Sequence, residues 1–86
     1  MLKNVNLVME RSGEKINALL GDISDSGVSP VIGLLYDVEL SSEEIGKIYR
    51  HGLRFNVTGG DRLLFNCKIF NVDDKYIKFI CKNDEW

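Results

Sequence analysis

Short runs in which apolar and polar residues alternate, separated by turn-forming residues, dominate this 86-residue sequence. Side chains alternate between the two faces of a strand, so each run predicts a β-strand with one buried face. In the second half a series of apolar residues occupies odd-numbered positions, namely Leu53, Phe55, Val57, Leu63, Phe65, Cys67, Ile69, Ile77, Phe79 and Cys81. A chain this rich in short strands can bury them only by rolling or closing a sheet.

The first half predicts a hairpin of the same kind. Val5, Leu7 and Met9 alternate with polar residues, the segment 11–14 contains turn-formers, and a return strand runs from Lys15 to about Leu20. Residues 31–40 form a third strand candidate, preceded by Pro30, which lacks a backbone donor. We therefore predict that the run after Leu20 is a turn.

One stretch predicts a helix. Ser41 followed three residues later by Glu44 has the form of a capping box, and Gly52 supplies a stop. Ile45, Ile48 and Tyr49 form an apolar stripe at helical spacing, which we expect to be buried against the sheet. We therefore predict a mainly β fold with one short helix, a small antiparallel β-barrel or rolled sheet of about six strands, in a single domain spanning residues 1–86.

The two cysteines, Cys67 and Cys81, lie on strands that the turn at 73–75 connects. Two odd-numbered apolar sets share a face across an antiparallel pair when the loop holds an odd number of residues, and a three-residue loop places Cys67 opposite Cys81. Directly opposed cysteines on adjacent strands usually strain a disulfide, so we expect free thiols.

Composition narrows the range of functions. The net charge of −2 disfavours nucleic acid and anionic membranes as partners. With no signal segment and no long apolar run, we expect a cytoplasmic protein. His51 stands alone and neither cysteine has neighbouring metal ligands. We expect no enzyme activity, no catalytic residue, no metal and no cofactor.

The most specific stretch runs from Asp22 to Gly27. Asp22 and Ser24 point to the same side of an extended backbone, and Gly27 allows close approach of a flat ligand. With Arg11 as the nearest cation along the chain, these residues are the candidate ligand-binding site. Asp, Ser and Gly are also ordinary turn-formers, which leaves a purely structural alternative open.

The run from Gly13 to Val28 resembles the second strand and following turn of a PilZ domain, and the run from Leu53 to Phe79 is similar to that family's closing meander. The resemblance implies a bacterial six-stranded barrel that binds cyclic di-GMP through an Arg-x-x-x-Arg loop and an Asp/Asn-x-Ser-x-x-Gly turn. The upstream arginine pair is missing, because Arg11 is followed by Lys15. Arg50 and Arg54 have the right spacing but lie downstream. The resemblance thus predicts a regulatory module, either a cyclic di-GMP receptor or a degenerate adaptor acting through protein contacts.

A second hypothesis of another class is a small acidic binding protein, such as a toxin immunity protein or a phage-encoded inhibitor. Such a protein covers a basic site on its target with carboxylates and aromatic residues. The segments 73–76 and 83–86 combine both residue types, and exposed Tyr76 and Trp86 would serve as interface anchors. Both hypotheses predict a protein partner, and cyclic di-GMP is the candidate small ligand.

Overall fold

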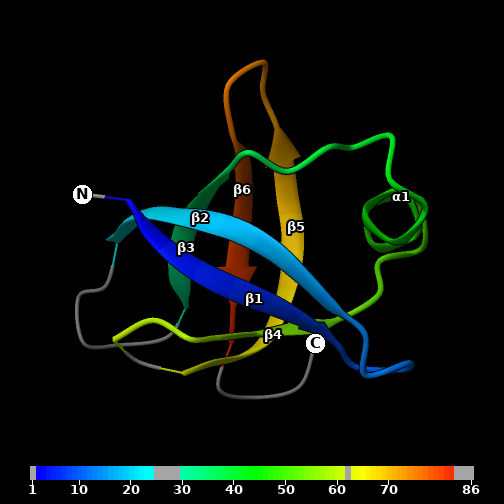
Figure 1. Cartoon of the computed structure of the whole chain (residues 1–86), viewed down its shortest axis with the longest axis horizontal. Helices are drawn as coiled ribbons and strands as arrows, with labels where there is room; N and C mark the ends of the chain where they lie inside the picture. The colour runs from blue at the N-terminus through cyan, green and yellow to red at the C-terminus, as the bar shows by residue number, and fades with distance from the viewer. Residues whose placement is uncertain (1, 25–29, 62, 83–86) are drawn as a thin grey trace.

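The computed structural model describes residues 2–24, 30–61 and 63–82 and shows a closed six-stranded antiparallel barrel with one helix (Figure 1). The predicted fold class is confirmed. The strands follow the order β1-β2-β3-β6-β5-β4 around the barrel, and β1 pairs with β4 to close it. The elements are β1 (Lys3–Met9), β2 (Lys15–Ser24), β3 (Val31–Tyr36), α1 (Glu43–His51), β4 (Phe55–Thr58), β5 (Leu64–Val72) and β6 (Ile77–Cys81).

Every neighbouring pair of strands is antiparallel, so neighbouring strands begin at opposite ends of the barrel. At one end β1 finishes at Met9, β2 begins at Lys15 and β4 begins at Phe55, a few residues after the helix. We call this the helix end. At the opposite end β2 finishes at Ser24 and β6 finishes at Cys81. The consequence is that residues close in sequence along one strand can lie at opposite ends of the molecule.

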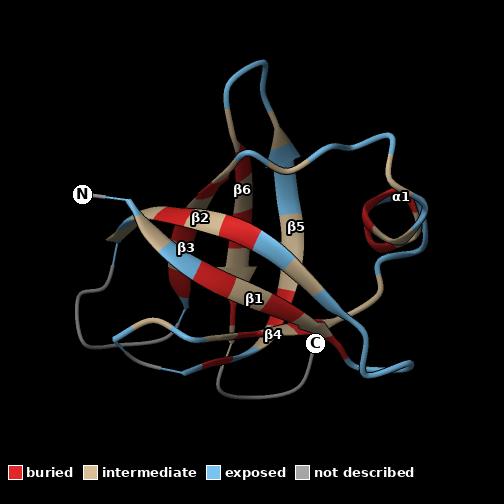
Figure 2. Cartoon of the chain, viewed as in Figure 1, coloured by how far each residue is buried: buried red, intermediate tan, exposed pale blue. Residues whose placement is uncertain are grey.

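The core fills the barrel interior with the inward-facing residues of all six strands (Figure 2). Phe55 and Phe79 are fully buried and meet edge to face with ring centroids 5.8 Å apart. Gly33 lies opposite Phe79 in the β3–β6 pair, and a Cβ atom at position 33 would come within 2.5 Å of the Phe79 ring. The absence of a side chain at Gly33 therefore leaves the space that the Phe79 ring occupies.

Helix α1 forms where the sequence predicted a helix, with two local differences. The N-cap is Ser42, whose Oγ accepts a hydrogen bond from the Ile45 amide at 3.4 Å, so the predicted cap at Ser41 was wrong by one residue. Ile45 and Ile48 are buried as predicted, but Tyr49 is 54% exposed, and its predicted burial was wrong. At nine residues the helix presents a stripe only two isoleucines wide to the barrel.

Strand β5 departs from the predicted alternation at its first half. Leu64 is buried, whereas Leu63 and Phe65 are each 57% exposed, so their predicted inward orientation was wrong. The phase changes at Asn66, which has a positive φ of 57° and donates its amide to Asn56 Oδ1 at 3.1 Å. This irregularity in the β4–β5 pairing returns Cys67 to the core side.

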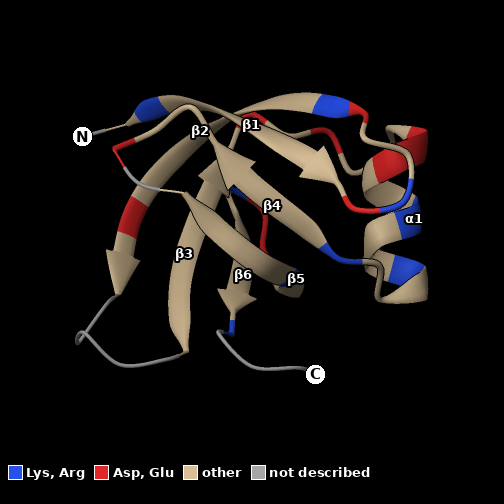
Figure 3. Cartoon of the chain, turned by 90° about the horizontal axis from the view of Figure 1, so that it is seen from below, with Lys and Arg blue, Asp and Glu red and all other residues tan. Residues whose placement is uncertain are grey.

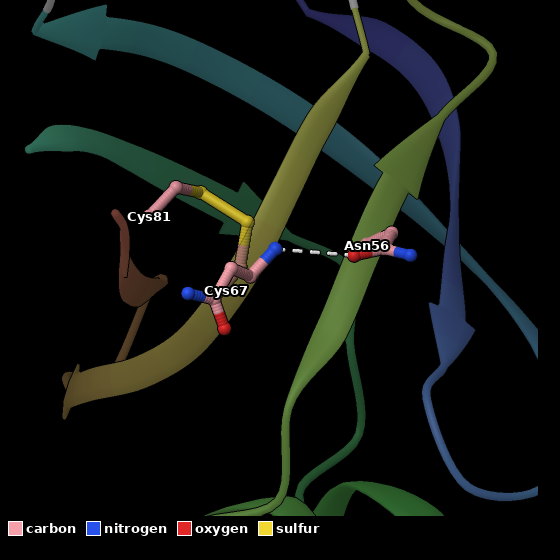
Figure 4. Close-up of a disulfide and its surroundings, with 4 residues drawn as sticks. Asn56, Cys67 and Cys81 are labelled. Atoms are coloured by element: carbon pink, nitrogen blue, oxygen red, sulfur yellow. Dashed lines mark hydrogen bonds between the residues drawn. A yellow bond between two sulfur atoms is a disulfide. The ribbon is translucent and has the colours of Figure 1, made fainter. Parts of the chain in front are cut away.

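Cys67 lies directly opposite Cys81 in the β5–β6 pair, as predicted, but the route to that register differs. The connection holds the four residues 73–76, and a second irregularity between Ile69 and Asn71 restores the register. The two cysteines form a disulfide, so the prediction of free thiols was wrong (Figure 4). Both side chains point into the core from facing positions, which brings the sulfur atoms together.

Strand β3 ends at Tyr36, short of the predicted end at Leu40. Asp37 adopts a positive φ of 55°, which turns the chain away from the sheet into the linker 37–42. The single helix in the described part of the chain falls short of the length and apolarity that a membrane crossing requires.

Candidate functional site

Asp22 and Ser24 lie near the end of strand β2, which continues through Ser24. The predicted turn after Leu20 was therefore wrong at these two positions. An irregularity between Leu20 and Ile23 changes the phase of the strand, so Ile23 packs against the core while Asp22 and Ser24 both face solvent. Among the described residues, no hydrogen bond or ion pair engages the Asp22 carboxylate. The common outward orientation expected for Asp22 and Ser24 is therefore present.

Arg11 is not near these two residues. It lies in the turn between β1 and β2 at the helix end, whereas Asp22 lies near the other end of β2. Asp22 lies seven residue steps beyond Lys15 along the strand, which corresponds to roughly 23 Å at about 3.3 Å per residue. Arg50 and Arg54 also flank the helix end, and Figure 3 shows basic and acidic residues together around α1 and a separate acidic band far along β2. Gly27 lies outside the described residues.

A groove of about 520 Å³ opens at the helix end, between the linker after β3 and the turn that joins β5 to β6. We call it the acidic groove. Its lining combines apolar side chains with four carboxylates and one lysine: Leu35, Asp37, Val38, Glu39, Leu40, Asp73, Asp74, Lys75, Tyr76 and Ile77. The two segments come from distant parts of the sequence and meet because β3 and β6 are neighbours.

Local hydrogen bonds shape the turn that forms one wall of the groove. The Asp73 amide donates to the Tyr76 carbonyl at 2.9 Å, and the Asp74 amide donates to Asp73 Oδ1 at 2.7 Å. The Tyr76 ring meets Tyr36 edge to face, with centroids 6.1 Å apart. The hydrogen bonds therefore fix the shape of the turn itself, and the ring contact holds Tyr76 against the end of β3.

The electrostatics of the groove favour a cation. Asp37, Glu39, Asp73 and Asp74 are all exposed, and within the described segments none of them takes part in an ion pair. The negative charge of Asp73, followed by the hydrogen bond that its carboxylate accepts from the phenol, raises the pKa of Tyr76 above its usual value of 10.0. The groove thus offers unpaired carboxylates beside apolar side chains, a combination suited to the charged head and aliphatic stem of lysine or arginine.

A second groove of about 500 Å³ at the helix end is lined by Met9, Arg11, Ser12, Glu44, Lys47, His51, Leu53 and Arg54. Its charges are largely paired. Lys47 lies 3.4 Å from Glu43 and 3.7 Å from Glu44, and these two carboxylates raise the pKa of Lys47. Arg54 lies 3.6 Å from Glu10. The acidic groove therefore carries the larger unpaired charge.

Sequence reasoning identified only half of the acidic groove. The sequence pattern marks the segment 73–76 as acidic and aromatic, but it places Asp37 and Glu39 in a strand over residues 31–40, whereas β3 ends at Tyr36. An aspartate after the apolar run 31–36 was the available signal, because aspartate tolerates the left-handed backbone that ends a strand. Residues 83–86, which the second hypothesis also invoked, lie outside the described residues.

Among the residues that the structure describes, no group of histidine, cysteine, aspartate or glutamate side chains is arranged to hold a metal ion. Comparison with protein-family models, with curated proteins and with solved structures finds no match to this chain.

Proposed function

We propose that this protein is a non-catalytic binding module whose acidic groove receives a basic segment of a partner protein. The observation that carries the proposal is the presence of unpaired carboxylates on both walls of a groove that is also lined by apolar side chains. Asp37 and Glu39 come from one wall and Asp73 and Asp74 from the other. A lysine or arginine entering between them would meet negative charge on two sides.

Complementary charge supports this role through specificity and association rate more than through raw affinity. The exposed carboxylates attract a basic segment at long range, while Val38, Leu40 and Tyr76 offer surface for its aliphatic parts. The net charge of −2 acts in the same direction. The proposal corresponds to the small acidic binding protein predicted from the sequence and is equally compatible with an adaptor of the PilZ-like kind.

The test uses a fluorescent peptide of alternating lysine and leucine, with a glutamate and leucine peptide as its counterpart. We expect the basic peptide to bind and the double variant Asp37→Asn/Glu39→Gln to bind it about tenfold more weakly, because two attractive charges are lost while the side-chain shapes remain. Asparagine also tolerates the positive φ at position 37. Fluorescence anisotropy at low and high salt measures the affinity, and salt should weaken it.

Asp22→Asn is the control for the single variant Asp37→Asn, because each removes one exposed carboxylate and Asp22 lies at the opposite end of the barrel. It should leave peptide affinity within about twofold of the parent. Equal weakening by both changes would indicate a non-specific effect of net charge and would reject the groove as the binding site. The same conclusion would follow if both peptides bound equally.

A cyclic di-GMP receptor is the second candidate, favoured by the outward-facing Asp22 and Ser24. Arg11, Arg50 and Arg54 all lie toward the helix end, so no arginine of the described residues stands beside Asp22 to neutralise a phosphate. We therefore expect calorimetric titration with cyclic di-GMP to show no binding. Binding that Asp22→Ala weakens by tenfold or more would favour the receptor over the adaptor.

We further propose a cytoplasmic location and a protein partner, without nucleic acid or membrane binding. The acidic net charge supports the absence of nucleic-acid and membrane binding, because it repels polyanions and anionic surfaces. A cytoplasmic location bears directly on the disulfide, since glutathione and thioredoxin systems keep most cytosolic thiols reduced.

A further inference from the structure

We propose that the Cys67–Cys81 disulfide is a redox-sensitive staple that holds the last strand, β6, in the barrel and so maintains one wall of the acidic groove. The part concerning the groove rests on the proposed function, whereas the part concerning β6 does not. The observations that carry the inference are the place of β6 in the sheet and the places of the two cysteines along it.

Strand β6 joins the two halves of the barrel. It lies between β3 and β5, and it pairs with both along its whole length, from Ile77 to Cys81. The first half of the sheet, β1 to β3, meets the second half only at two seams, the β1–β4 pair and the β3–β6 pair. If β6 detached, β3 and β5 would each expose an unpaired edge and the buried ring of Phe79 would be lost from the core.

The two covalent restraints on β6 act at opposite ends of the strand. At the helix end the turn 73–76 connects it to β5, and this turn is also a wall of the acidic groove. At the other end Cys81, the final residue of β6, is bonded to Cys67 across a separation of 14 residues (Figure 4). With the disulfide open, that end of β6 is held only by hydrogen bonds and burial.

The chemistry of opening is thiol–disulfide exchange. A dithiol donates two electrons and two protons, the bond between the Cys67 and Cys81 sulfur atoms breaks to give two thiols, and the reagent closes into its own cyclic disulfide. Because Cys67 is fully buried and Cys81 nearly so, the reagent reaches the sulfur atoms when the end of β6 opens transiently. A low-molecular-weight disulfide reverses the reaction.

Amide hydrogen exchange of the oxidised and dithiothreitol-reduced protein tests the staple, with intact mass confirming that the reduced form is two units heavier. A bridge closing a loop of this length restricts the open state enough that reduction should speed exchange of β6 about a hundredfold. The β1–β2 hairpin should respond much less. Unchanged exchange in β6, or equal acceleration of every strand, would overturn the selective staple.

The binding readout uses the lysine and leucine peptide. Reduction should weaken its binding several-fold in the parent protein, and the variant Cys67→Ala/Cys81→Ala should bind weakly with or without dithiothreitol. Equal binding by oxidised and reduced protein, despite faster exchange of β6, would overturn the link to the groove. If the peptide binds neither form, the proposed function fails, while the exchange experiment still decides whether the staple exists.

Discussion

Gly33 shows how one missing side chain determines the packing of a small core. The residue faces the barrel interior from β3, and a Cβ built there would lie 2.5 Å from Cζ and 2.6 Å from Cε1 of Phe79. Phe79 is fully buried and also meets Phe55 edge to face, so its ring has no free space to move into. The glycine is required here by the close approach of a ring and not by backbone conformation.

We expect Gly33→Ala to destabilise the protein by about 1 to 3 kcal/mol, the usual result of overpacking a filled core. Urea unfolding measures the loss. The double variant Gly33→Ala/Phe79→Leu should lose less than the sum of the two single changes, because the smaller leucine makes room for the methyl group. Additive losses would show that the two positions do not compete for space.

At the scale of elements, the sequence predicted which segments form strands and helix better than it predicted where their faces point. Periodicity placed β1 and β6 correctly, and it identified Ile45 and Ile48 as the buried face of α1. It failed for Tyr49, because a short helix that covers a barrel end has room for a narrower buried stripe. It also failed for Phe65, because the left-handed backbone of Asn66 and its hydrogen bond to Asn56 change which face of the sheet the side chains of β5 occupy. The alternation of apolar and polar residues does not reveal such bulges.

Helix α1 provides a test with an internal control. Ile48→Ala should destabilise the protein by about 2 to 4 kcal/mol through lost transfer energy and cavity formation, since the side chain is fully buried. Tyr49→Ala, the adjacent position with a half-exposed ring, should change stability by well under 1 kcal/mol. Thermal unfolding of both variants gives the comparison, and similar losses would mean that the helix does not pack on its isoleucine face.

At the scale of the whole molecule, the sequence alone did not predict which residues form the candidate site. Asp22 and Arg11 are near neighbours in the chain, yet a strand carries them to opposite ends of the barrel. Conversely, Asp37 and Asp73 are distant in the chain but line one groove, because β3 and β6 are adjacent. Local patterns contain no information on which strands become neighbours across the closure, whereas the β content and strand number follow from alternation and turns alone.

The closed topology also predicts slow folding. Closure pairs Met9 with Phe55 and Asn6 with Thr58, so loop entropy must be lost before these contacts form. We expect refolding on a scale of milliseconds to seconds, as in other barrels dominated by non-local contacts. Stopped-flow fluorescence after dilution from urea measures the rate. Refolding in microseconds would imply that local contacts dominate and would contradict the closed barrel.

The arrangement of strand directions has a practical consequence for handling the protein. With six antiparallel strands, the start of β1 at Lys3 and the finish of β6 at Cys81 fall at the barrel end opposite the helix (Figure 1). The acidic groove lies at the helix end. A bulky reporter or an immobilisation tether attached at either of these positions would therefore be joined at the end of the barrel away from the groove, and the immobilised protein would leave the groove open to solution.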